Sequence, residues 1–145
     1  MPETGSRNDP FSVFNFQVDI DGVGKAAFSE CSGLTTETDV IEYRTGDEDI
    51  TVRKLPGLKK FTNISLKRGF TDSKALWEWR KKVLDGKTER RSGSIVLLNE
   101  AREKALEWKF REGWPSKWEG PTLNAKTNEA AIETLEIACE GIELA

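Results

Sequence analysis

The chain of 145 residues contains no histidine, the side chain that most often carries proton transfer near neutral pH. Without histidine, neither a Ser-His-Asp triad nor a Cys-His pair can form, and the commonest zinc sites are excluded. The remaining residues show no catalytic constellation. We therefore expect a protein that is not an enzyme and that has no catalytic site, no cofactor and no metal.

The sequence also lacks a large excess of charge of either sign. Lys and Arg number 22 and Asp and Glu number 25, so the formal net charge is −3. A chain this balanced has no general attraction for nucleic acid. No apolar run comes near the ~20 residues that a membrane span requires, so we expect no membrane insertion by this chain alone.

Cysteine is scarce, and the first ten residues lack the apolar core of a signal peptide. Cys31 and Cys139 are far apart in the sequence, and a single distant pair is a poor disulfide framework. We expect both to behave as small apolar residues in a protein made in the cytoplasm. Residues 1–10 are expected to be a flexible terminus, and residues 11–145 are long enough for a single domain.

Most of the chain shows the pattern of β-strands. Apolar and polar side chains alternate from Phe14 to Ile20, which predicts a half-buried strand. Two glycines in DGVGKAAF predict a turn into the next strand. Further strands are expected in TETDVIEYRTG, ITVRKLPG and FTNISLKRG, with Pro56-Gly57 and Gly69 as breaks, and a hairpin is expected from GSIVLLNE and ALEWKFREGW.

One segment, TDSKALWEWRKKVLDG, predicts a helix from about Asp72 to Leu84. Thr71 or Asp72 can cap its start, and Gly86 stands where a left-handed C-terminal cap is expected. The predicted apolar face consists of Leu76, Trp79, Val83 and Leu84.

The last segment, NEAAIETLEIACEGIEL, fits two patterns. Helical spacing is shown by Ile132, Leu135, Cys139 and Ile142. Strand spacing is shown by Leu135, Ile137 and Cys139. Spacing alone favours a helix here. With many strands elsewhere, the chain is predicted to be α+β and mostly β.

Four tryptophans are candidates for packing. Trp77 and Trp79 are two residues apart in the predicted helix, so they point in different directions and only one can enter the core. Trp114 and Trp118 lie in FREGWPSKWEGPTLNA, where two prolines lack the amide proton that a helix interior or a central strand uses. This stretch is either a packed joint or an aromatic platform for a sugar.

Two loop patterns indicate ligand sites only weakly. GVGKAA at 22–27 contains the Gly-Lys pair of a phosphate-binding loop, but Asp19 and Ala26 occupy two further motif positions that need other residues. The stretch 19–30 matches part of a calcium loop, but Val23 stands at a ligand position and the preceding segment is predicted as a strand. A solvated hairpin turn accounts for both patterns.

A charged stretch runs from Arg44 to Lys60. Its acidic group, Asp47, Glu48 and Asp49, is followed by a basic group, Arg53, Lys54, Lys59 and Lys60. Two interpretations stay open: a solvated hairpin, or a head-to-tail contact in which the acidic part of one copy meets the basic part of another.

Four motifs, RKLPG, LKRG, LWEWRK and WPSKWEGP, occur in an order and spacing that resemble the tail tube protein family of contractile phages. The chain looks closer to the inner-tube proteins of extracellular contractile injection systems, which are phage-tail-like particles of bacteria. The resemblance runs from about Phe14 to Leu144, nearly the whole chain.

The resemblance implies a fold similar to that of Hcp of type VI secretion. Two packed antiparallel sheets form a barrel-like body with one flanking α-helix, and the last segment is a strand. An extended hairpin or loop at about 44–60 reaches an adjacent ring, so the charged residues of that stretch become candidates for inter-ring contacts. Trp77, Trp79, Trp114 and Trp118 become candidates for packing positions.

The function that the resemblance implies is structural. Six copies close into a ring, and rings stack into a hollow tube that sheath contraction drives through a target envelope with a cargo of protein effector or DNA. The implied partners are further copies of the chain, a sheath protein, baseplate or spike proteins, and tape-measure or cap proteins. Assembly is expected in the bacterial cytoplasm, for either a phage tail or a phage-tail-like particle. The alternative function is a small carbohydrate-binding β-sandwich that uses exposed tryptophans.

Overall fold

The computed structural model describes residues 9–44, 46 and 51–145, which form ten strands and one helix. The predicted class, α+β and mostly β with antiparallel sheets, is confirmed. The strands are β1 (Phe16–Ile20), β2 (Gly24–Ala26), β3 (Glu30–Ser32), β4 (Thr36–Tyr43), β5 (Arg53–Phe61), β6 (Ile64–Gly69), β7 (Arg91–Leu98), β8 (Lys104–Glu119), β9 (Ile132–Ala138) and β10 (Gly141–Leu144), and the helix is α1 (Ala75–Leu84).

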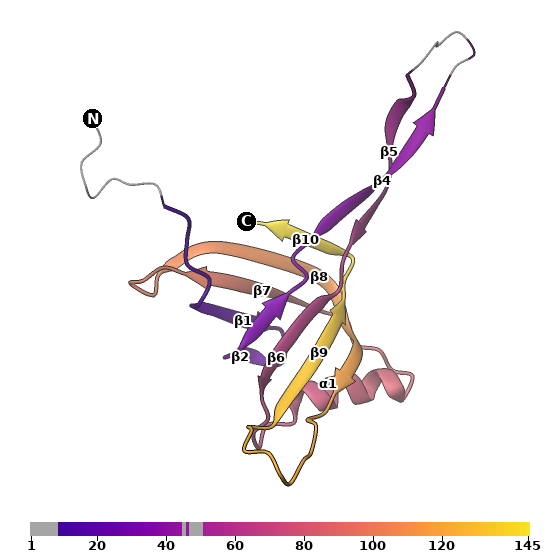
Figure 1. Cartoon of the computed structure of the whole chain (residues 1–145). Coiled ribbons are helices and arrows are strands. Elements are labelled where there is room, and N and C mark those ends of the chain that lie inside the picture. The colour runs from indigo at the N-terminus through magenta and orange to yellow at the C-terminus, as the bar shows by residue number, and fades with distance from the viewer. Residues whose placement is uncertain (1–8, 45, 47–50) are drawn as a thin grey trace, which may run out of the picture.

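Strand β8 joins the two layers of the body (Figure 1). The hydrogen-bonded order is β2-β1-β7-β8-β9-β6-β3, with β10 also paired to β8, and neighbouring strands are antiparallel. Phe110 of β8 has partners on both β7 and β10, so these two strands lie on opposite edges of β8. The sheet bends at β8, so that the strands form two packed layers. These layers do not close into a barrel.

The last segment is a strand, as the family resemblance predicts, and the helix favoured by spacing is wrong. Strands β9 and β10 follow one another along β8, with a kink where the amide of Glu140 donates to the carbonyl of Arg111 at 3.1 Å. Glu133, Leu135 and Ile137 are buried in alternation, which is the period of two that a strand imposes.

Pro115 lies inside β8, and the expectation that this stretch is neither a helix interior nor a central strand agrees with its position, because in the described chain β8 is paired on one edge only there. It stands opposite Ile137 beside a bulge in the β8–β9 pairing. Within the described chain, β9 is the only strand paired with β8 beyond Gly113, so the other edge has no ladder to interrupt. Proline is tolerated at such edges and bulges.

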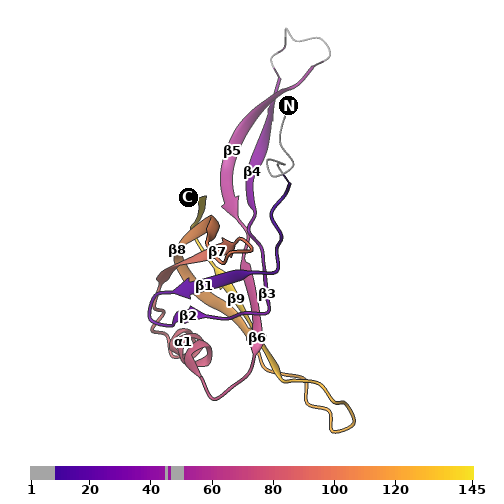
Figure 2. The same cartoon turned by 90° about the vertical axis from the view of Figure 1, so that its left-hand side faces the viewer.

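Strands β4 and β5 form a hairpin that projects from the body (Figures 1 and 2). They continue β3 and β6, so one antiparallel ribbon runs from the body into the projection. The stretch 44–60, which the resemblance assigns to the hairpin, contains most of β5, whereas β4 precedes it. Pro56 was expected to break the strand but lies within β5 opposite Val40, where the hairpin is only two strands wide.

The first strand is shorter than its alternating pattern predicts. It begins at Phe16, and Phe14 is 70% exposed, whereas Val18 and Ile20 are buried. The turn expected after it is present, because Gly22 and Gly24 both have a φ of 81°, a conformation that glycine adopts without strain. Strand β3 has only three residues and was not predicted.

Helix α1 covers the core with part of the face that spacing predicts. Leu76 and Trp79 are buried and Val83 is half-buried, but Leu84 is 58% exposed. The buried core comprises Val18, Ile20, Phe28, Ile64, Leu66, Leu76, Trp79, Ile95, Phe110, Leu135 and Ile137.

The sequence predicts the C-terminal end of α1 correctly but not its N-terminal cap. Lys74 occupies the N-cap and makes no side-chain capping hydrogen bond, so the expected cap by Thr71 or Asp72 is wrong. Gly86 has a φ of 78°, as expected for a left-handed residue just past the helix.

Replacing Leu76 by alanine tests the packing of α1. The side chain is 0% exposed, so Leu76→Ala should lower the free energy of unfolding by about 2–5 kcal/mol. Leu84→Ala is the matched control, because Leu84 lies on the same helix and is exposed. Chemical denaturation followed by circular dichroism measures both. Equal losses for the two variants would show that the helix buries a different face.

Candidate functional site

The projecting hairpin exposes apolar side chains on both faces. Ile41 stands opposite Leu55, and Tyr43 shares their face; the three are 51%, 45% and 50% exposed. Val40, on the opposite face, is 62% exposed. No other described element packs extensively on either strand. An isolated two-stranded hairpin is marginally stable in water, so this hairpin has the surface of a segment that packs against another molecule.

The basic residues named as inter-ring candidates are on β5, opposite acidic residues of β4. Lys54 stands opposite Glu42. Lys60 stands opposite Glu37 and forms an ion pair with Asp39, with Nζ and Oδ1 3.0 Å apart. Lys59 is exposed on the same strand. Part of the positive charge is therefore balanced within the hairpin itself, a pairing that the sequence interpretation did not include.

The two other described charges of the stretch lie where β4 ends and where β5 begins. Arg53 is the first residue of β5, and Arg44 directly follows β4. Asp47, Glu48 and Asp49 lie outside the described residues. Their head-to-tail contact with a second copy stays a prediction.

Phe70, Trp77 of α1 and Trp118 of β8 form an aromatic cluster. The centroids of Trp77 and Trp118 are 5.0 Å apart with planes inclined at 56°, and those of Phe70 and Trp118 are 5.9 Å apart with planes at 88°. Rings at these angles share no plane, so they do not make a flat stacking platform. Trp118 also packs against the core.

The other two candidate tryptophans lie apart from this cluster. Trp79 is buried, and its Nε1 donates to the carbonyl of Glu89 at 2.8 Å, with the Arg91 guanidinium 5.0 Å from its ring. Trp114 is half-buried on β8 opposite Ala138. The structure thus brings the rings of Trp77 and Trp118 into contact, whereas Trp79 is buried in the core and Trp114 lies on β8.

A buried ion pair supports the aromatic cluster, and sequence reasoning missed it. Arg68 Nε lies 2.5 Å from Glu133 Oε1, with the two side chains 11% and 0% exposed. The other oxygen of Glu133 accepts from Trp118 Nε1 at 3.3 Å. The signal in the sequence was an acidic residue on the same strand face as Leu135 and Ile137. Such a carboxylate needs a buried cation as partner.

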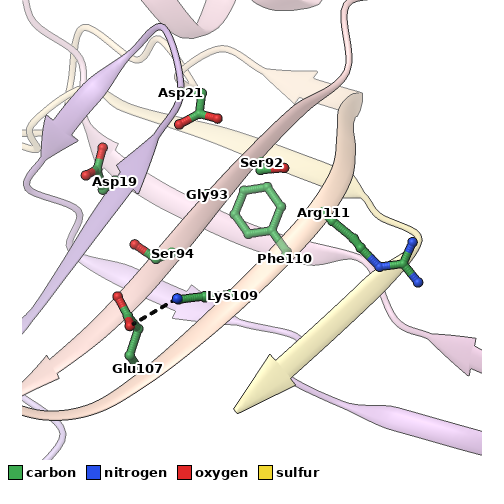
Figure 3. Close-up of a pocket in the computed structure, with 9 residues that line it drawn as sticks. All are labelled: Asp19, Asp21, Ser92, Gly93, Ser94, Glu107, Lys109, Phe110 and Arg111. Atoms are coloured by element: carbon green, nitrogen blue, oxygen red, sulfur yellow. Dashed lines mark ion pairs between the residues drawn. The ribbon is translucent and has the colours of Figure 1, made fainter. Parts of the chain in front are cut away.

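The outer face of β1, β7 and β8 carries a shallow polar hollow of about 350 Å³ (Figure 3). Asp19, Ser94, Lys109 and Glu107 line part of it. A hydrogen bond from Lys104 lowers the pKa of Glu107, which therefore stays ionised. Among the described residues, no cluster of acidic residues and cysteines could hold a metal ion. The lining carries three acidic side chains, Asp19, Asp21 and Glu107, and two basic ones, Lys109 and Arg111.

Both cysteines are free thiols. Burial raises the pKa of Cys31 to about 11, and burial also raises the pKa of Cys139. A thiol reacts through its thiolate, so both side chains should react slowly near neutral pH.

Comparison with known proteins identifies the family. The sequence model of the T4-like virus tail tube protein gp19 family matches residues 12–143. The chain belongs to this family. It is a family of structural tail tube proteins and not of enzymes, so the resemblance stated from the sequence motifs is confirmed.

Solved structures place this tail tube protein near the contractile injection systems. A chain of the PVC sheath-tube complex in its extended state is 27% identical, covers 100% of this chain and 99% of its own, and superposes with a TM-score of 0.88. A chain of the anti-feeding prophage cap is 27% identical, with coverage of 100% and 99% and a TM-score of 0.87. Hcp1 from Flavobacterium johnsoniae is 18% identical, with coverage of 90% and 94% and a TM-score of 0.59, which shows a shared fold.

No curated protein matches this tail tube chain in sequence. In the described residues, none of the helical structure is long and apolar enough to cross a bilayer.

Removing the buried carboxylate should destabilise the subunit. Glu133→Ala leaves the Arg68 charge buried without its partner, and we expect a loss of about 3–5 kcal/mol in the free energy of unfolding. Glu119→Ala is the control, because that exposed carboxylate pairs with Lys117 at the surface. Urea denaturation followed by tryptophan fluorescence measures both. A loss for Glu133→Ala no larger than the control's would contradict the assigned role.

Proposed function

We propose that the chain is the repeating subunit of the hollow inner tube of a contractile injection system or phage tail. Six copies close into a ring, rings stack into a conduit, and sheath contraction drives the conduit through a target envelope. Membership of the tail tube family supports this proposal. The observation that carries it is the projecting hairpin, whose apolar side chains Ile41, Tyr43 and Leu55 remain about half exposed in the subunit.

The hairpin acts in this proposal as the inter-ring contact. Ile41, Tyr43 and Leu55 bury their side chains against the body of a copy in the next ring. Such a contact is heterologous, and repeating it builds a filament and not a closed dimer. Asp47, Glu48 and Asp49 add attraction to a basic surface of that copy, although each exposed ion pair contributes little on its own.

The proposed partners follow from the assemblies in which the matched chains occur. These include a sheath-tube complex, a baseplate, a tube-terminating cap, and a sheath and tube terminator. A sheath protein, baseplate proteins and a cap are therefore the expected neighbours of this tube. Assembly takes place in the bacterial cytoplasm, and the cargo is a protein effector or DNA.

The carbohydrate-binding alternative has less support. A sugar platform needs exposed aromatic rings in one plane, and the rings of Trp77 and Trp118 are inclined at 56°. Trp118 is also held by the core and by Glu133. A packing role for the aromatic cluster agrees better with these contacts.

Polar substitutions on the hairpin test the proposed function. The double variant Ile41→Ser with Leu55→Ser should fold as a monomer but form few filaments, because the apolar contact between rings is lost. Leu84→Ser is the matched control, an exposed leucine on α1 away from the hairpin. Negative-stain microscopy counts filaments, and circular dichroism checks the fold. Filaments of normal length from the folded double variant would refute the hairpin contact, and a wild-type chain that forms neither rings nor filaments would refute the tube.

A further inference from the structure

An open recess of about 310 Å³ is lined by the aromatic cluster and one lysine: Phe70, Lys74, Trp77 and Trp118. Helix α1, which carries Trp77, lies toward the end of the body that faces away from the projecting hairpin (Figures 1 and 2). The wall is apolar apart from the lysine. A recess of this volume is at the lower end of the range of ligand sites, so it suits a small group or a side chain of a partner.

The Trp118 side of the recess is fixed by the interior of the subunit. Trp118 Nε1 donates to Glu133 Oε2 at 3.3 Å, and this buried carboxylate is the ion-pair partner of Arg68. The ring of Phe70 meets that of Trp118 edge to face. The position of Trp118 is therefore set before any ligand arrives, and a preformed site loses less entropy on binding.

The Trp77 side of the recess has a hydrogen-bond donor to offer. Trp77 is half-buried, and none of the described residues accepts a hydrogen bond from its Nε1. This nitrogen is not sealed from solvent either. An indole N–H donates and does not accept, so it suits a carbonyl oxygen of a ligand.

Two lysines bracket Trp77 along α1. Lys74 comes three residues before Trp77 and Lys81 comes four residues after it, which is the spacing of neighbours on one helix face. Both lysines are exposed, and neither forms an ion pair within the described part of the chain. Two unpaired cations beside an apolar recess favour a ligand with negative charge.

These features disfavour two common ligands of aromatic sites. A quaternary ammonium group would meet the like charge of Lys74, and none of the described side chains that line the recess is a carboxylate. A sugar would need coplanar rings, whereas those of Trp77 and Trp118 are inclined at 56°. A proline ring is uncharged and packs into aromatic-lined grooves. An extended proline-rich segment also has no internal hydrogen bonds, so its backbone carbonyls are free to accept one.

We propose that the recess binds a proline-containing acidic segment of a partner protein. A proline ring packs against Trp77 and Trp118, and Trp77 Nε1 donates to a backbone carbonyl of the segment. Lys74 and Lys81 pair with carboxylates on either side of the proline. The inference goes beyond the proposed tube function, because it concerns a partner other than a second copy and a surface other than the hairpin.

A peptide titration tests the recess. The probe is the acetylated peptide Glu-Pro-Pro-Glu-Pro-Pro-Glu, which has no aromatic group, and it is added to the isotopically labelled full chain. NMR follows the indole N–H signals of the five tryptophans, and the Trp77→Phe variant identifies the signal of Trp77. We expect that signal to shift and to saturate. A peptide with alanine in place of proline should bind about ten-fold more weakly or less.

Variants measured by calorimetry separate the contributions. Trp77→Ala should weaken binding by about thirty-fold, as expected for a central aromatic contact. Trp77→Phe keeps a ring but removes the donor, and the expected loss is about three- to ten-fold. Lys74→Glu combined with Lys81→Glu should weaken binding by about two- to ten-fold. Lys87→Glu is the matched control, an exposed lysine just past α1, and should bind as the wild type does.

Circular dichroism checks the fold of each variant, and Trp77→Phe with the lysine variants decides the question if Trp77→Ala does not fold. Any of four results would overturn the proposal. They are no shift of the Trp77 signal at about 1 mM peptide, equal affinity for the alanine peptide, an equal loss in the Lys87→Glu control, and a Trp77 response to tetramethylammonium or to a cellulose oligosaccharide in place of the peptide. Filament formation by the hairpin variants is measured separately, so a failure here leaves the tube function standing.

Discussion

The fold depends on the antiparallel ladder that β8 shares with β9 and β10. This ladder runs from one layer into the other and ties the chain's last residues to both. Because β7 holds the opposite edge of β8, the two apolar faces are forced to meet, and they enclose Phe110, Leu135 and Ile137. The core, the position of α1 and the kink at Glu140 are consequences of that single bent ladder.

The subunit has a buried apolar core, but its periphery is left incomplete. Buried charge is paired, as Arg68 and Glu133 show. In contrast, the hairpin exposes apolar side chains on both faces, and two strand edges of one layer have no partner within the described chain. These unsatisfied features point in different directions in space (Figures 1 and 2), one out of the body and the others along it. A subunit that assembles in two directions needs both an exposed projecting surface and unpaired strand edges.

Sequence patterns predicted the strands and the helix where burial has a simple period. They failed where a long-range pairing overrides local preference. Spacing favoured a helix at 132–142, but the ladder with β8 makes that segment a strand, and Pro56 stands within β5 because the two-stranded hairpin accepts it. The motif resemblance corrected the first error. The partner of Glu133 could not be predicted, since Arg68 lies 65 residues away in the chain and only the β6–β9 pairing brings the two together.

The continuity of the projecting hairpin with the body has a mechanical consequence. Residues 33–35 join β3 to β4 and residues 62–63 join β5 to β6, and hydrogen bonds from Thr62 to Thr35 and Gly33 tie the two connections together, so a pull along the hairpin acts lengthwise on strands β6 and β9. Their hydrogen bonds lie across the strands and resist such a pull in shear, all at once, whereas a force applied at a strand end would open them one after another. A particle that accelerates its tube by force on these hairpins would load each subunit along its strongest direction.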